Sequence, residues 1–258
     1  MRLMKRILSA AAVLALSASL LVGCSSGTAS SVPVSASSAA ESTVSSVEET
    51  ASSAVDENEA AAAQLLNDLT GSYQELWPVI LADEYKQTWL DDCTALVGED
   101  NAEAAFEKLS SMVTSDVYGE DAVEAYANGG GAYFCGFTND LATLTFDGAT
   151  STISGTDKDG NVLFSHTYHY IGMEPVRGLY EFQSDDADSG EFTYFFLAPD
   201  TSAETYHIEF RYGSDAEALS QYDAGEYAYW VASGISTDCD QTMIDNCIEL
   251  FCTENLAG

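Results

Sequence analysis

The sequence predicts a mainly β domain in which an antiparallel barrel is bracketed by N-terminal helices and a C-terminal helix. After residue 128, short segments rich in Thr, Tyr and Phe alternate polar and apolar residues, which is typical of antiparallel strands. Asn139-Asp140, Asp147-Gly148 and Asp159-Gly160 separate several of these segments and favour hairpin turns. Seven or eight consecutive strands of this kind predict an up-and-down barrel, because closure hides the edges of the sheet.

The individual elements follow from local periodicity. Apolar residues recur at helical spacing in residues 84–97 and again in residues 101–113. Ser72–Leu81 is predicted to be a short helix that Pro78 limits. Two more helices are predicted near the end of the chain, at about residues 214–222 and 240–256. The predicted strands are Ala132–Phe137, Leu141–Phe146, Ser151–Gly155, Val162–Ile171, Leu179–Phe182, Phe192–Leu197 and Thr205–Tyr212.

The first 23 residues are predicted to be the signal peptide of an exported lipoprotein. Arg2, Lys5 and Arg6 precede an apolar run that is too short and too rich in small residues for a stable membrane span. The run ends in LVGC, which is similar to the bacterial lipobox, where the signal is cut before the cysteine and a lipid is attached to its sulfur. We therefore expect a lipid on Cys24 and a membrane-anchored protein on the extracellular or periplasmic side. The alternative is an ordinary signal peptide that ends near a cysteine.

The mature chain divides into a tether and one domain. Residues 24–56 are rich in Ser, Ala, Thr and acidic residues and contain no aromatic residue, so they predict a disordered tether. Residues 57–258 are long enough for one domain with a sizeable core, and their first part, about 57–127, is predicted to be helical.

The charge of the chain restricts its partners. It has 42 acidic residues against eight basic ones, and three of the basic residues lie in the signal peptide. Since DNA and RNA are polyanions, we expect no nucleic-acid partner. The acidic surface favours solubility beside a membrane and attracts cations weakly. A generic acidic extracellular surface and a dedicated cation-collecting surface both fit this composition.

The three histidines are the candidate metal ligands. His207 lies on a predicted strand with Thr205, Glu209 and Arg211 on the same face, which is either a solvent face or the wall of a cavity. Glu209 would add a carboxylate ligand, or it is a surface residue beside Arg211. His166 and His169 are three residues apart on another strand and face opposite sides, so without a bulge only one can share a cavity with His207.

Other residue patterns carry less specific signals. The acidic segments DKDGN and SDDADSGE have alternating oxygen ligands but lack the spacing of a calcium loop, and hairpin turns are the simpler interpretation. No sequence motif of a nucleophile, metalloprotease or phosphate-binding loop is present, so we expect no enzyme and no catalytic residues. The aromatic residues of the strands either line a ligand pocket or fill a small barrel.

The exported domain has five cysteines, Cys93, Cys135, Cys239, Cys247 and Cys252. An odd number leaves at least one thiol unpaired. Cys93 and Cys247 fall on apolar helical faces and are expected to pack as small hydrophobic residues. Cys239 has Cys247 and Cys252 as candidate partners, but spacing alone does not select between them.

Several segments, in their order along the chain, carry a family resemblance: YQELWPVIL, GLYEF, SGEFTYFFLAP, YHI, GSDAEAL and YAYW. With these segments the chain, from about Leu69 to Leu256, resembles the ZinT (YodA) family and the same domain in bacterial zinc-binding lipoproteins of the AdcA type. The resemblance implies a lipocalin-like (calycin) antiparallel barrel. It also implies a role in zinc capture or hand-off at the cell surface, with a metal-uptake protein as partner.

The resemblance places the family's three zinc-binding histidines on Phe195, Thr205 and His207. Only His207 retains the imidazole. A zinc site usually needs three or four protein ligands, so the candidate set for zinc becomes His207 with His166 or His169 and Glu209. The alternative is a metal-free module that binds a small ligand in the barrel or a protein partner through its acidic surface.

Overall fold

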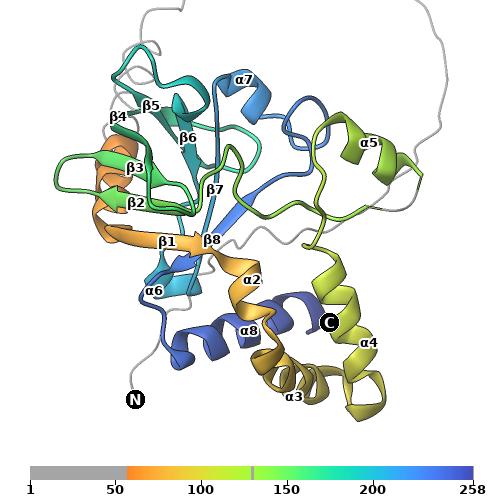
Figure 1. Ribbon diagram of the computed structural model, residues 1–258. Helices are drawn as coiled ribbons and strands as arrows, with labels where there is room; N and C mark the ends of the chain where they lie inside the picture. Colours follow the sequence, from red (N-terminus) through yellow and green to blue (C-terminus); the bar gives the residue numbers. More distant parts are fainter. Residues whose placement is uncertain (1–56, 129–130, 258) are drawn as a thin grey trace, which may run out of the picture. The chain divides into compact units, whose positions relative to one another are not determined.

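The computed structural model describes residues 57–128 and 131–257. The predicted signal peptide, the predicted lipid attachment site Cys24 and the predicted tether lie outside the described residues. Eight strands of the described residues form one closed antiparallel barrel in which each strand pairs with its neighbours in sequence and β1 pairs with β8 (Figure 1). The predicted fold class, an antiparallel barrel with helices at both ends of the domain, is confirmed.

The strands are β1 (Gly71–Glu75), β2 (Thr143–Asp147), β3 (Thr152–Thr156), β4 (Val162–Met173), β5 (Tyr180–Ser184), β6 (Tyr194–Leu197), β7 (Ile208–Gly213) and β8 (Ala232–Ser236). A helix at residues 57–68 precedes β1. The other helices are α2 (Leu76–Ile80), α3 (Lys86–Val97), α4 (Glu99–Ser111), α5 (Glu120–Ala127), α6 (Ser202–Thr205), α7 (Ala216–Leu219) and α8 (Gln241–Leu256), with 3₁₀ turns η1 (Asp83–Tyr85) and η2 (Gly190–Phe192).

The apolar residues form two cores. The first fills the barrel and takes alternate residues of the strands, such as Ile208, Phe210 and Tyr212 of β7. The second lies among α2, α3, α4 and α8, which gather at one end of the barrel in Figure 1. Trp89 is completely buried there, and its indole N–H donates to the Ile80 carbonyl (2.7 Å). The aromatic side chains of the strands therefore mainly fill the barrel rather than line an open cavity.

Three local predictions were wrong. Ser72–Leu81 is not one helix: its first residues form β1, where Tyr73 pairs with both Leu144 and Ser236 and so closes the barrel. Ala132–Phe137 is not a strand, since only Phe134 makes isolated bridges there. The strand predicted to start at Thr205 starts at Ile208, because α6 comes first and Tyr206 turns the chain with φ 66°. β8 was not predicted, because its ASGIS sequence has little strand character of its own.

The helix at residues 57–68 packs closely against the β2–β3 hairpin. Leu65 and Leu66 of the helix are buried in the barrel core. A Cβ atom at Gly148 would lie 2.4 Å from the Asn67 Cα, so this approach requires glycine in the hairpin. The Gly148 N–H also donates to Thr70 Oγ1 (3.1 Å). The helix is therefore part of the folded domain and covers one side of the barrel beside β2 and β3 (orange in Figure 1).

Candidate metal site

His207 is held in one orientation directly before β7. Its Nδ1 lies 2.7 Å from the Thr205 carbonyl oxygen. A carbonyl oxygen only accepts, so Nδ1 carries the proton and Nε2 has the free lone pair. This Nε2 lies 4.0 Å from Glu209 Oε1. Metal-bound histidines in proteins usually show the same arrangement, with one ring nitrogen bonded to a carbonyl or carboxylate and the other on the metal.

His207 faces α8, on the opposite side of β7 from the barrel interior. Its Nδ1 is 3.8 Å from the Sγ of Cys247, which lies on α8. Its neighbour Ile208 belongs to the barrel core. Burial raises the pKa of the Cys247 thiol to about 12, which keeps this sulfur protonated at neutral pH. Without a metal, Cys247 therefore packs against the imidazole as a neutral thiol.

Two carboxylates that were not predicted from the sequence, Asp200 and Glu254, interact electrostatically with His207. Burial raises the pKa of Asp200, and the negative charges of Glu204 and Glu209 raise it further, whereas His207 lowers it. Burial also raises the pKa of Glu254 on α8, and there too His207 acts in the opposite direction. Asp200 follows β6 and Glu254 is on the last helix, so no local pattern links them to His207. Only the pairing of β6 with β7 and the packing of α8 bring them near it.

The other two histidines are engaged elsewhere. His166 Nδ1 lies 2.7 Å from Asp186 Oδ2, and His169 Nδ1 lies 2.6 Å from Asp185 Oδ1. The His166 side chain is 16% exposed and that of His169 is 52% exposed, in line with opposite faces of β4. Within residues 57–128 and 131–257, no group of three or more His, Cys, Asp or Glu side chains is arranged to hold a metal ion. The structure thus brings Glu209 to His207 but does not gather His166 or His169 into a metal-binding group with it.

The two positions where the resemblance placed further histidines do not flank His207. Phe195 is completely buried inside the barrel, with its ring 5.3 Å from that of Tyr212 and 5.4 Å from that of Tyr168. Thr205 ends α6, and its hydroxyl lies within hydrogen-bond distance of the carbonyl oxygens of Thr201 (3.2 Å) and His207 (2.9 Å). Among the described residues, neither side chain makes a hydrogen bond with the His207 imidazole.

The face shared by His207, Glu209 and Arg211 is not uniform. Arg211 is completely buried, and its guanidinium donates to the carbonyl oxygens of Leu219, Gln221 and Tyr227. It also stacks on the Tyr222 ring, with Cζ 4.4 Å from the ring centre. Glu209 is exposed, as the interpretation of a surface residue expected. The guanidinium of Arg211 is instead buried and directed at the segment that follows β7.

The cysteines and the acidic turns have structural roles. All five cysteines of the described residues are free thiols, and the Sγ atoms of Cys93 and Cys252 lie 3.9 Å apart.

In the DKDGN segment, Asp157 Oδ1 accepts from the backbone N–H groups of Asp159 and Asn161. This carboxylate stabilises a hairpin turn, as the simpler interpretation of that segment predicted.

We expect the protein to be more stable in mildly acidic solution than at neutral pH. Burial is the largest cause of a raised pKa at Asp92, Glu181, Asp200 and Glu254, whereas the exposed Asp157 has the opposite shift. A carboxyl whose pKa is raised by folding binds more protons in the folded state, so the free energy of unfolding falls as pH rises above the ordinary carboxyl pKa of about 4. Thermal unfolding followed by circular dichroism should give a higher midpoint at about pH 5 than at about pH 7.5. A midpoint that rises over this range would contradict the expectation.

Comparisons with known proteins give a limited likeness. No family model and no curated protein matches the chain. Among solved structures, it is similar to the Zn(II)-bound ZinT-like domain of Streptococcus pneumoniae AdcA, with 15% identity, a TM-score of 0.45, and coverage of 71% of this chain and 89% of that one. It is also similar to Zn(II)-bound AdcA of the same organism, with 15% identity, a TM-score of 0.43, and coverage of 70% of this chain and 34% of that one.

Both structures belong to the family that the sequence resembles, but at these values the likeness carries no argument about function. In the described part of the chain, none of the helices has the length and apolar character needed to cross a membrane.

Proposed function

We propose that the protein is an exported, lipid-anchored and non-catalytic binding protein that takes up a divalent transition metal, zinc first, at His207. One observation carries the proposal: the bond from Nδ1 to the Thr205 carbonyl leaves the Nε2 lone pair of His207 free, beside the carboxylate of Glu209. Imidazole nitrogen and carboxylate oxygen are both ordinary zinc ligands. The lipobox-like end of the signal segment supports the anchor at Cys24.

The proposed ligands are His207 and Glu209, with Asp200 or Glu254 supplying a further oxygen. The charges of these acidic groups affect one another and His207, and a divalent cation would relieve their mutual repulsion. Tight zinc sites have three or four preset protein ligands, whereas the described residues hold no such group, so the set has to assemble when the metal binds. This favours reversible binding, which suits capture and hand-off to a metal-uptake protein better than permanent storage.

Calorimetric titration of the full chain with zinc tests the proposal. We expect one saturable site with a Kd of about 1 µM or tighter, and a loss of at least about tenfold in affinity in His207→Ala. Glu209→Gln should weaken binding less, because one carboxylate is replaced by a neutral oxygen donor. His169→Ala is the matched control, since this imidazole is bonded to Asp185. Absence of a saturable site, or equal affinity in His207→Ala and the wild type, would refute a metal site here.

The anchor has a separate test. Replacing the proposed lipid-bearing residue, Cys24→Ser, should move the protein from the membrane fraction to the soluble exported fraction, because no thiol remains for the lipid. Cell fractionation followed by immunoblotting measures this. A variant that stays in the membrane fraction would show that something other than Cys24 retains it.

One observation favours the alternative of a metal-free binding module. A pocket lies between the helix at residues 57–68 and the Pro199–Glu204 segment, and its lining residues do not include His207.

A further inference from the structure

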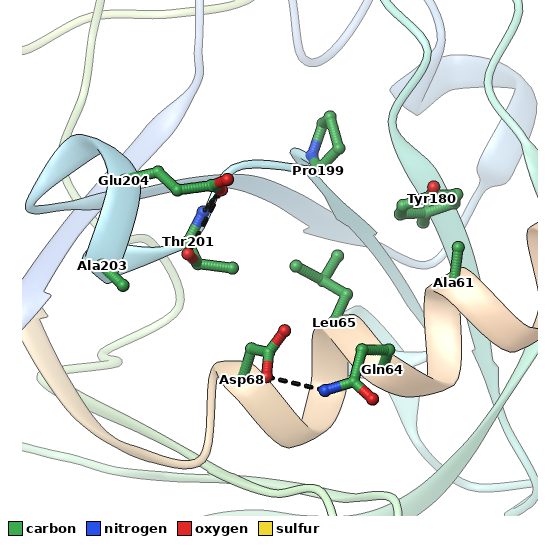
Figure 2. Close-up of a pocket in the computed structure, with 9 residues that line it drawn as sticks. All are labelled: Ala61, Gln64, Leu65, Asp68, Tyr180, Pro199, Thr201, Ala203 and Glu204. Carbon is green, nitrogen blue, oxygen red and sulfur yellow. Dashed lines mark hydrogen bonds between the residues drawn. The ribbon is translucent and has the colours of Figure 1, made fainter. Parts of the chain in front are cut away.

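The pocket has the size of a small-molecule site. It has a volume of about 560 Å³, within the range usual for ligand pockets. Three separate parts of the domain form it: the helix at residues 57–68, the start of β5, and the segment from the end of β6 through α6 (Figure 2). The lining residues are Ala61, Gln64, Leu65, Asp68, Tyr180, Pro199, Thr201, Ala203 and Glu204.

The lining has a polar end and an apolar end. Figure 2 shows Asp68 and Glu204 toward one side, with Tyr180 and Ala61 toward the other and Leu65 between them. Leu65 is buried and belongs to the barrel core, which supplies a firm apolar floor. The nine lining residues include two carboxylates and no basic side chain, so the pocket complements a positive group attached to an apolar body.

Both carboxylates belong to exposed residues, and each makes its hydrogen bonds through a single oxygen. Asp68 Oδ1 accepts from Gln64 Nε2 (2.8 Å). Glu204 Oε2 accepts from the backbone N–H and the hydroxyl of Thr201 (both 3.3 Å), which forms the capping box of α6. Among the bonds within the described residues, the second oxygen of each carboxylate has no partner. Each carboxylate is therefore oriented by one oxygen and leaves the other free to accept from a ligand.

We propose that this pocket binds a small organic ammonium ion: a primary amine whose charged end lies between Asp68 and Glu204 and whose apolar body lies on Leu65 against Tyr180 and Pro199. The ammonium group supplies three N–H donors to the free carboxylate oxygens. The Tyr180 ring offers an apolar face that also tolerates a nearby cation. A neutral ligand of the same shape gains only the apolar contacts, and an anion is repelled by both carboxylates. The pocket does not include His207, so this inference does not rest on the metal site.

The test uses 2-phenylethylamine, with 2-phenylethanol as the neutral comparison, on the ¹⁵N-labelled full chain at low salt. NMR titration should give saturable shifts of the amides of the lining residues with a Kd of about 1 mM or tighter for the amine, and at least tenfold weaker binding of the alcohol. Equal affinities for the two compounds, or shifts spread over the acidic surface without saturation, would overturn the proposal.

Matched variants locate the site. Asp68→Asn and Glu204→Gln together should weaken amine binding at least tenfold while keeping the acceptors that Gln64 and Thr201 use, so the fold is retained. Glu107→Gln, on the exposed face of α4, removes one surface charge and should leave binding unchanged. Ala61→Trp should fill the apolar end and weaken the amine and the alcohol together. His207→Ala should bind the amine as the wild type does. Wild-type affinity in the double variant would overturn the proposal.

Discussion

Arg211→Ala should lower the free energy of unfolding by about 3–5 kcal/mol, because it removes the donors of a completely buried network. The guanidinium donates to the carbonyl oxygens of Leu219, Gln221 and Tyr227, and its bonds to Leu219 and Tyr227 are buried. Burial lowers the pKa of Arg211 to about 10, still well above neutral pH, so the group is charged there. Urea unfolding of the full chain followed by tryptophan fluorescence measures the loss.

Two further variants distinguish the network from general packing. Arg177 also stacks on the Tyr222 ring, with Cζ 4.1 Å from the ring centre, but Arg177 is not fully buried. Arg177→Ala should therefore cost much less than Arg211→Ala. Arg211→Lys keeps the charge but loses the planar guanidinium that donates to three carbonyl groups. It should therefore recover only part of the stability. A cost below about 1 kcal/mol for Arg211→Ala would show that the network is not stabilising.

Phe195→Ala should also lower the free energy of unfolding by about 3–5 kcal/mol, because it leaves a cavity in the middle of the barrel. The Phe195 ring is completely buried and lies 5.3 Å from Tyr212 and 5.8 Å from Phe164. Closely packed aromatic neighbours relax only partly into such a space. Chemical unfolding again measures the change, and Leu163→Ala, at an exposed position of β4, is the control that should cost little.

Phe195→His tests the position at which the resemblance implies a zinc ligand. Because Phe195 lies inside the barrel and His207 faces α8, the new imidazole should not raise the zinc affinity. It should instead destabilise the protein, since a buried imidazole among aromatic rings lacks hydrogen-bond partners. Tighter zinc binding by Phe195→His, measured by the same calorimetry, would show that the two positions share a site after all.

Much of the barrel was predictable because its signals are local. Six of the seven predicted strands have counterparts in the structure, and they carry alternating aromatic and β-branched residues with hairpin turns such as Asp147-Gly148 between them. The strands that close the barrel were missed. β1 lies before an apolar stretch with helical spacing, and β8 consists of small residues. Both depend on pairing with each other across more than half of the domain, which no local pattern reports.

The candidate site was predictable in part. His207 directly precedes β7 and Glu209 is the second residue of that strand, so the predicted two-residue spacing of an extended chain correctly brought the two side chains to the same side. Arg211 is on the same face and was misjudged, because alternation does not reveal that residues 219–227 cover that part of the sheet. Asp200 and Glu254 near His207, and the pocket between the first helix and α6, require elements distant in sequence to meet.

By itself, the sequence determined an acidic chain with a β-rich domain, because composition, periodicity and turn residues act over short distances. Only the tertiary structure decided that His207 faces α8 and that Asp200 and Glu254 lie near it. It also decided that Phe195 is core and that a pocket with two carboxylates opens beside residues 57–68. The physical reason is that side-chain alternation defines two faces of a strand, whereas the packing of α8 and the other elements decides what each face meets.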